Sequence, residues 1–359
     1  MLKHRTMPVT AGATWVPASL MAPVGALVAL MALATATTHG SAASSAARGV
    51  VYTANEHGNS VSAVDLATGK TTSVDVHITP HNVQASADGR LLLATGPLAG
   101  AGHGHAPGEG RGRLLVLDAD ALAAGPIADI EVGRHPAHVV IDAAGRLVFV
   151  TNAEDATVSV VDLARGEVVK SIATGAYPHG LRLSPDGREL YVANVKDGSV
   201  SVIDTGALAE VARIPVGEAP VQVGFSPDGG RVFVSLRDED RVAVIDTPTR
   251  KVIGRIAVGR GPIQVYATPD GREVYVANEG ARENPDDRVS VIDVAQGEVV
   301  ATVVTGKGAH GVVVSPGGER AFVTNIRDAT VSAIDTATRE VVATYAVGAG
   351  PNGITYGAN

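Results

Sequence analysis

Apolar and polar residues alternate in short runs along most of the chain, and these runs recur as one repeated unit. In the clearest copy, residues 199–204 read Ser-Val-Ser-Val-Ile-Asp, an alternation that predicts a β-strand with one buried face. Residues 184–187 read Ser-Pro-Asp-Gly, which suits a type I turn because Pro presets φ at the second position. No repeat has convincing helical periodicity, so each copy predicts four short strands joined by tight turns.

A large apolar residue in the second strand of each copy marks the period of the repeat. The intervals between these markers are mostly about 42 residues, a period typical of arrays and propellers. Four short strands per unit at this period predict an all-β fold, a seven-bladed β-propeller. The seven marker positions are Tyr52, Leu93, Phe149, Tyr191, Phe233, Tyr275 and Phe322.

The tetrapeptides that begin at the markers resemble a known repeat signature. Residues 191–194 read Tyr-Val-Ala-Asn, and residues 149–152 and 322–325 both read Phe-Val-Thr-Asn. With the flanking Ser-Pro-Asp-Gly and Val-Ser-Val-Ile-Asp elements, they resemble the YVTN family of β-propeller repeats over nearly the whole repeated region. That resemblance implies an extracytoplasmic propeller, and the fold alone implies no single activity. The copies at 93–96 and 233–236 lack the Asn.

The repeat is permuted relative to the chain. Residues 50–54 form a second strand with no first strand before them, and residues 351–356 form a first strand with no second strand after them. Joined, the two segments complete one blade. We therefore expect the strand at 353–356 to pair beside 50–54, closing the ring by overlap of the N- and C-terminal strands and removing open edges.

Residues 1–43 differ from the repeats and predict a signal peptide. A basic start precedes an apolar run at 20–34, and the small residues at 40–42 suit a cleavage site. The run is short for a membrane span, so we expect removal and a mature propeller at 44–359. A protein so processed is secreted or periplasmic, or lies at the cell surface, and no second apolar run of spanning length follows.

Charge and cysteine content exclude several function classes. The chain has no Cys, which excludes disulfides, covalently attached c-type haem and thiol nucleophiles. Without the signal peptide, 27 basic residues stand against 37 acidic ones. No basic cluster is present, so nucleic acid and anionic membranes are poor partners.

Candidate chemistry gathers on one face of the predicted ring, which we call the upper face. Antiparallel strands place the start of strand one and the loop after strand two on this face, and the Ser-Pro-Asp-Gly turns on the other. Both long insertions, Gly96–Gly112 and Gly280–Asp287, fall in that upper loop, and function tends to lie on such loops. The second insertion is rich in charge, which suits a solvated loop, with a Ca²⁺ or partner contact as the alternative.

Polar residues recur where strand one begins, at the expected mouth of a central channel. Imidazole is a good ligand for copper and zinc, so a copper or zinc ion is the candidate cofactor. A ring of seven strands holds distant members apart, so all the histidines cannot meet at one ion. The candidate metal ligands are His81, His138, His179 and His310 on strand one, with His103 and His105 in the first insertion.

A structural interpretation competes with the metal site. Pro-His-Gly could be a family turn whose imidazole only bonds backbone groups. His138 also stands one residue out of step with His81, and a slip of one residue normally reverses the face of a strand. The same face offers other candidate ligand-binding residues, three at the channel mouth and two loop arginines that could hold an anion: Asn352, Gln222, Gln264, Arg237 and Arg327.

No nucleophile elbow, phosphate-binding loop or His-Glu-x-x-His motif is present. The sequence therefore favours a binding or scaffold protein over an enzyme, with a small ligand or a protein as partner on the upper face. Two alternatives stay open. One is a propeller enzyme of the lactonase, lyase or copper-dependent oxidoreductase type, and the other is a cell-surface structural protein.

Overall fold

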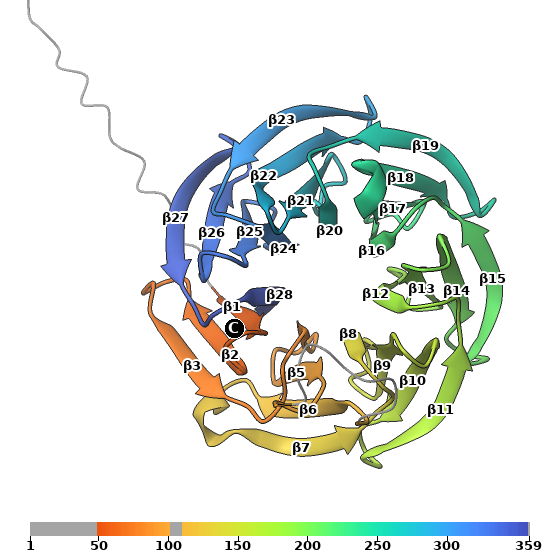
Figure 1. Cartoon of the computed structure of the whole chain (residues 1–359), viewed down its shortest axis with the longest axis vertical. Helices are drawn as coiled ribbons and strands as arrows, with labels where there is room; N and C mark the ends of the chain where they lie inside the picture. The colour runs from red at the N-terminus through yellow and green to blue at the C-terminus, as the bar shows by residue number, and fades with distance from the viewer. Residues whose placement is uncertain (1–48, 101–109, 358–359) are drawn as a thin grey trace, which may run out of the picture. The chain divides into compact units, whose positions relative to one another are not determined.

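The computed structural model describes residues 49–100 and 110–357, which form a ring of seven four-stranded antiparallel sheets (Figure 1). The predicted seven-bladed β-propeller is confirmed. Helical structure in the described part is limited to two short 3-10 turns, η1 (Leu122–Ala124) and η2 (Arg237–Glu239). No helix within these residues is long and apolar enough to cross a membrane. The predicted signal peptide, residues 1–43, lies outside the described residues.

Each blade is one sheet whose first strand lies nearest the ring axis and whose fourth lies at the rim (Figure 1). We number the blades from the one that joins both ends of the repeats. Blade 1 is β28 (Pro351–Gly357), β1 (Val50–Asn55), β2 (Ser60–Asp65) and β3 (Thr71–Asp75); blade 2 is β4 (Asn82–Ala85), β5 (Leu91–Gly96), β6 (Arg113–Asp118) and β7 (Pro126–Glu131). Blade 3 is β8 (Pro136–Ile141), β9 (Leu147–Asn152), β10 (Thr157–Asp162) and β11 (Glu167–Ala173); blade 4 is β12 (Pro178–Leu183), β13 (Glu189–Asn194), β14 (Ser199–Asp204) and β15 (Ala209–Pro215). Blade 5 is β16 (Pro220–Phe225), β17 (Arg231–Leu236), β18 (Arg241–Asp246) and β19 (Lys251–Ala257); blade 6 is β20 (Pro262–Ala267), β21 (Glu273–Ala281), β22 (Asn284–Asp293) and β23 (Glu298–Val304). Blade 7 is β24 (Ala309–Val314), β25 (Arg320–Asn325), β26 (Thr330–Asp335) and β27 (Glu340–Ala346).

The ring closes within blade 1. β28 pairs with β1 in antiparallel fashion, with Tyr52 opposite Thr355 and Val51 opposite Tyr356. The predicted overlap of the N- and C-terminal strands is therefore confirmed. Because β1 also pairs with β2, this closure leaves β1 no open edge.

The hydrophobic core lies between neighbouring blades rather than inside one sheet. One cluster joins Tyr191 and Val200 of blade 4 to Val234 and Ala243 of blade 5. Burying a large apolar side chain stabilises a fold by about 1.5–3 kcal/mol, so each marker residue contributes to holding two blades together. The fully buried aromatic markers are Phe149, Tyr191, Phe233, Tyr275 and Phe322.

The Asn of the repeat signature has a structural role. Asn152 is fully buried, and its Oδ1 accepts a hydrogen bond from the Gly133 backbone N–H at 3.0 Å. Its Nδ2 donates to Thr157 Oγ1 at 3.0 Å and to Ser159 Oγ at 2.9 Å. One side chain thus ties strand two to strand three and to the connection that enters the blade, which accounts for its recurrence.

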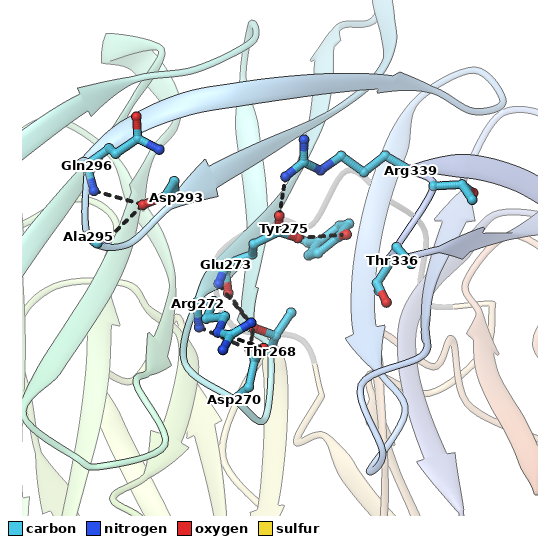
Figure 2. A network of polar contacts seen from close by, with 12 residues as sticks. Thr268, Asp270, Arg272, Glu273, Tyr275, Asp293, Ala295, Gln296, Thr336 and Arg339 are labelled. Atoms are coloured by element: carbon cyan, nitrogen blue, oxygen red, sulfur yellow. Dashed lines mark hydrogen bonds and ion pairs between the residues drawn. The ribbon is translucent and has the colours of Figure 1, made fainter.

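On the face opposite the insertions, polar contacts hold the tight turn between β20 and β21, and an ion pair next to this turn connects blade 6 to blade 7 (Figure 2). In the turn between β20 and β21, Thr268 Oγ1 donates to Asp270 Oδ1 at 2.6 Å, and the Arg272 N–H donates to the same oxygen at 3.0 Å. Glu273 then pairs with Arg339 of blade 7 at 2.5 Å (Figure 2). These contacts make the turns rigid and join neighbouring blades at this face.

The two insertions differ in form. The second, at Gly280–Asp287, lengthens the β21–β22 hairpin, with Gly280 opposite Pro285 and Ala281 opposite Asn284. It is therefore mostly strand rather than the loop that its composition predicts. The first insertion leaves β5 at Gly96, and its candidate ligands His103 and His105 lie outside the described residues.

Candidate functional site

Three histidines from three consecutive blades meet at the upper end of the ring axis, where strand one begins. His81 immediately precedes β4, His138 lies on β8 and His179 on β12. Each offers a nitrogen, and these nitrogens all lie within 4.8 Å of one another. His81 Nε2 and His179 Nε2 are 3.0 Å apart, and the ring centroids of His138 and His179 are 4.8 Å apart. We call this group the three-His cluster.

A bulge in strand one explains why residues out of step in the sequence reach the same place. Pro178 pairs with Asn194, but Leu181 pairs with Val192, so two residues of β12 oppose one of β13. The same shift occurs in β8 between Pro136 and Val139. Because a bulge re-aims side chains locally, simple alternation does not hold here, and the argument that His138 must face away from His81 fails.

The three rings are held by different partners. His179 Nδ1 donates to the Val221 carbonyl oxygen at 3.2 Å, which leaves its Nε2 facing His81. His138 Nδ1 lies 3.4 Å from Gln222 Nε2. Thr151 Oγ1 accepts from the His138 backbone N–H at 2.9 Å and donates to the His179 carbonyl oxygen at 2.7 Å, so the two strand starts are fixed to each other.

His81 is backed by a carboxylate that sequence analysis missed. Glu56 Oε2 lies 3.4 Å from His81 Nδ1 and also accepts a hydrogen bond from Asn352 Nδ2. Burial alone would raise the pKa of Glu56, but its contacts with His81 and Asn352 outweigh burial and lower the pKa below its ordinary value. Glu56 is therefore an anion at neutral pH, placed behind the ring that faces the cluster.

A signal for Glu56 exists in the sequence. Blades 1 and 6 follow the signature Asn directly with Glu, as Asn55-Glu56 and Asn278-Glu279. Both Glu side chains approach imidazoles of the upper end. The residue after the signature Asn is thus a site-facing position.

Burial favours the uncharged form of two of the three histidines. It lowers the pKa of His138 and His179 well below the ordinary value, and the neighbouring imidazoles lower it further. His138 is only 1% exposed. Neutral imidazoles with free lone pairs are the form that binds metal ions.

His310 lies at the same end but forms a separate group. Its Nδ1 donates to the Asn352 carbonyl oxygen at 3.2 Å, and its Nε2 lies 3.8 Å from Glu279 Oε2. Glu279 Oε1 in turn lies 3.5 Å from Arg327 Nη2. Burial lowers the pKa of His310, although Glu279 opposes this effect. Asn352, through its backbone and side chain, connects this group to His81.

The remaining predicted ligand-binding residues do not form one site. Gln222 contacts His138, whereas Gln264 Oε1 accepts from the Val312 N–H at 3.4 Å. Arg237 is exposed and pairs with its neighbour Asp238 at 2.7 Å. Arg327 belongs to the His310 group, so these two arginines do not clamp a shared anion.

One acidic residue of the blade 6 insertion is buried and paired with two arginines. Asp286 is 1% exposed, and its Oδ2 lies 2.5 Å from Arg288 Nη2 and 3.6 Å from Arg260 Nε. Two guanidinium groups thus neutralise the buried carboxylate of this hairpin.

Comparison with known proteins supports the fold assignment. The family model of YNCE-like beta-propellers matches residues 134–236. Kuenenia stuttgartiensis hydrazine synthase shares 22% identity, with a TM-score of 0.65, covering 78% of this chain and 90% of that chain. A functionally unknown protein from Desulfotomaculum acetoxidans DSM 771 shares 14% identity, with a TM-score of 0.71, covering 86% of this chain and 99% of that chain.

At these identities the solved structures show a common fold and nothing of activity. The comparison with curated proteins gave no match. The family-model match spans blades 3 and 4 and the first two strands of blade 5, and the other blades repeat the same strand order. The chain is therefore a seven-bladed β-propeller repeat protein, and residues 134–236 are similar to YNCE-like beta-propellers.

Proposed function

We propose that this protein binds one copper or zinc ion through His81, His138 and His179. The observation that carries the proposal is the convergence of three imidazole nitrogens, from three separate blades, within 4.8 Å. A Pro-His-Gly turn that served only the backbone would not require these rings to face one another.

The donor set fits such an ion. Zinc binds imidazole nitrogen at about 2.0–2.1 Å, so two nitrogens on a tetrahedral ion stand about 3.3 Å apart. The 3.0 Å between His81 Nε2 and His179 Nε2 is close to that value. The third nitrogen, from His138, lies within 4.8 Å of these two.

The surrounding groups would orient the ligands. The Val221 carbonyl oxygen accepts from His179 Nδ1 and so directs its Nε2 lone pair into the cluster. Glu56 is placed to do the same for His81, since a carboxylate behind a ligating imidazole fixes its tautomer and increases its basicity. Three protein ligands leave one coordination position for a fourth group, for which His103 and His105 of the first insertion are the candidates.

An open fourth position also favours a second candidate function. Structural zinc sites use four protein ligands, whereas catalytic sites keep three and leave one position for water or substrate. If the insertion does not supply the fourth ligand, a metal-dependent enzyme of the oxidoreductase type is the alternative. The extracytoplasmic location that we propose rests on the predicted signal peptide at residues 1–43.

Calorimetric titration of metal-free protein, purified without a His tag, tests the proposal. We expect Cu²⁺ or Zn²⁺ to bind with a stoichiometry of one, and His81→Ala with His179→Ala to abolish that binding. His77→Ala is the matched control, because His77 is an exposed imidazole paired with Asp129 at 3.0 Å. Binding of both ions weaker than about 0.1 mM, far below structural metal sites, would contradict the proposal and favour a scaffold role.

A further inference from the structure

The lower end of the ring axis, where strand one ends, holds a cavity that the three-His cluster does not use. Its volume is about 270 Å³, just below the range of about 300–1,000 Å³ for small-molecule sites. Inner-strand residues of blades 4, 5 and 6 line it, together with the tight turns that follow them. The lining residues that matter here are Arg182, Gly224, Phe225, Tyr266, Pro227 and Pro269.

One register position supplies three of the residues that line the cavity. The residue of strand one that pairs with the marker of strand two is Arg182 in blade 4, Gly224 in blade 5 and Tyr266 in blade 6. Gly224 has no side chain, and a Cβ at this position would lie 3.0 Å from the Val265 carbonyl oxygen, so the glycine lets the inner strands of blades 5 and 6 approach closely. At the same position the other blades carry Gln84, Val140, Val313 and Thr355.

Arg182 is a largely buried cation with little compensation. Its Nη1 donates to the Leu181 carbonyl oxygen at 3.3 Å, and no carboxylate in the described part of the chain lies within ion-pair distance of it. Burial lowers the pKa of the guanidinium, while Tyr266 acts in the opposite direction. A guanidinium nevertheless stays protonated in proteins, and a buried charge without a partner is costly.

We propose that this cavity binds a small organic monocarboxylate, paired with Arg182. The planar guanidinium fork matches a carboxylate in bidentate fashion. Phe225 and the rings of Pro227 and Pro269 provide apolar walls for the rest of the ligand, and no acidic residue lines the cavity. An aromatic or short-chain acid therefore suits both the charge and the walls.

Benzoate is the test ligand, titrated by calorimetry into the full-length protein at low chloride, with benzyl alcohol as its neutral counterpart. We expect benzoate to bind and benzyl alcohol not to bind. Arg182→Gln should weaken benzoate binding about tenfold or more. Arg188→Gln is the matched control, because Arg188 is an exposed arginine of the adjacent turn, 3.8 Å from Asp186, and should leave binding unchanged.

Arg182→Lys keeps the positive charge but loses the fork, so its affinity should fall between those of the wild type and Arg182→Gln. A circular-dichroism melt of each variant establishes that it is folded. The double replacement of His81 and His179 by Ala should leave benzoate binding intact, which separates this site from the metal site. Benzoate binding that survives Arg182→Gln, or no benzoate binding to the folded wild type at millimolar concentration, would overturn the proposal.

Discussion

The two ends of the ring axis use the same strand in opposite ways. At the upper end, strand one begins with a bulge, and imidazoles from three blades meet beside Glu56. At the lower end, the same strands run in regular register, and a lone guanidinium, Arg182, faces an apolar cavity. The upper end thus presents imidazole nitrogens that can bind a cation, and the lower end presents a cation with no carboxylate within ion-pair distance among the described residues. The repeated strand places side chains at both ends of the axis. The residue types that differ between blades, such as His81 and Arg182, determine what each end can bind.

Removal of β28 should have the largest effect, because this strand runs from one end of the axis to the other. Truncation after Gly350 exposes β1 and removes the buried side chains of Asn352 and Ile354. We expect no cooperative thermal transition by circular dichroism. Truncation after Gly357 leaves β28 whole and is the control. A native-like melt of the shorter protein would show that the closing strand is dispensable.

Glu56→Gln tests the upper end of the axis separately from the lower end. The change keeps the shape of the side chain but removes the charge behind His81. Partners behind a metal ligand typically contribute 10–100-fold in affinity, so we expect zinc or copper binding to weaken by about that factor. Benzoate binding at the lower end should not change. Glu319→Gln, on an exposed turn of the opposite face, serves as the control. An unchanged metal affinity in Glu56→Gln would refute the role of Glu56.

The stability of the metal-free protein should fall with acidification below about pH 6.5. His138, His179 and His310 have folded pKa values below those of the unfolded chain, so the unfolded state takes up protons first. Their contribution is complete above the unfolded pKa of about 6.5 and is lost as pH falls toward the lowered folded values. Between pH 5 and 6.5 the carboxylate of Glu56 stays ionised, because its pKa is lowered.

Chemical denaturation measured across this pH window checks the expectation. The free energy of unfolding should fall more steeply in the wild type than in a variant with His138 and His179 both replaced by Gln. Equal slopes would mean that the imidazoles are already solvated and do not form a buried cluster.

Arg182→Met should change the free energy of unfolding least of these variants. Whether the change stabilises or destabilises the protein shows whether Arg182 lacks a partner. Arg182 is partly buried and has no carboxylate within ion-pair distance among the described residues, so an apolar side chain of similar length removes the cost of holding this charge away from water. We expect the free energy of unfolding of ligand-free protein to rise by about 1 kcal/mol, while benzoate no longer raises the melting temperature. A clear loss of stability would indicate that Arg182 already has an adequate partner.

The fold could be predicted from the sequence because its signals are local and repeated. Alternation in residues 199–204 and the turn at 184–187 recur at one period, and each copy repeats the same information. Even the ring closure follows, since two incomplete copies can only complete each other.

The site could be predicted in part. His81, His138 and His179 follow from aligning the repeats, but their convergence depends on a bulge that the residue pattern does not reveal. The contact of Glu56 with Asn352 joins opposite ends of the chain through blade 1, so neither residue indicates the other locally. The importance of Arg182 emerges only when Gly224 and Tyr266 are seen beside it, because a cavity is a property of three neighbouring blades.

Anomalous diffraction from crystals of the zinc-loaded protein tests the central claim most directly. We predict a single strong zinc peak at the upper end of the axis, about 2.0–2.1 Å from one nitrogen of each of His81, His138 and His179. A peak elsewhere, or the absence of a peak at the cluster in fully loaded crystals, would contradict the account.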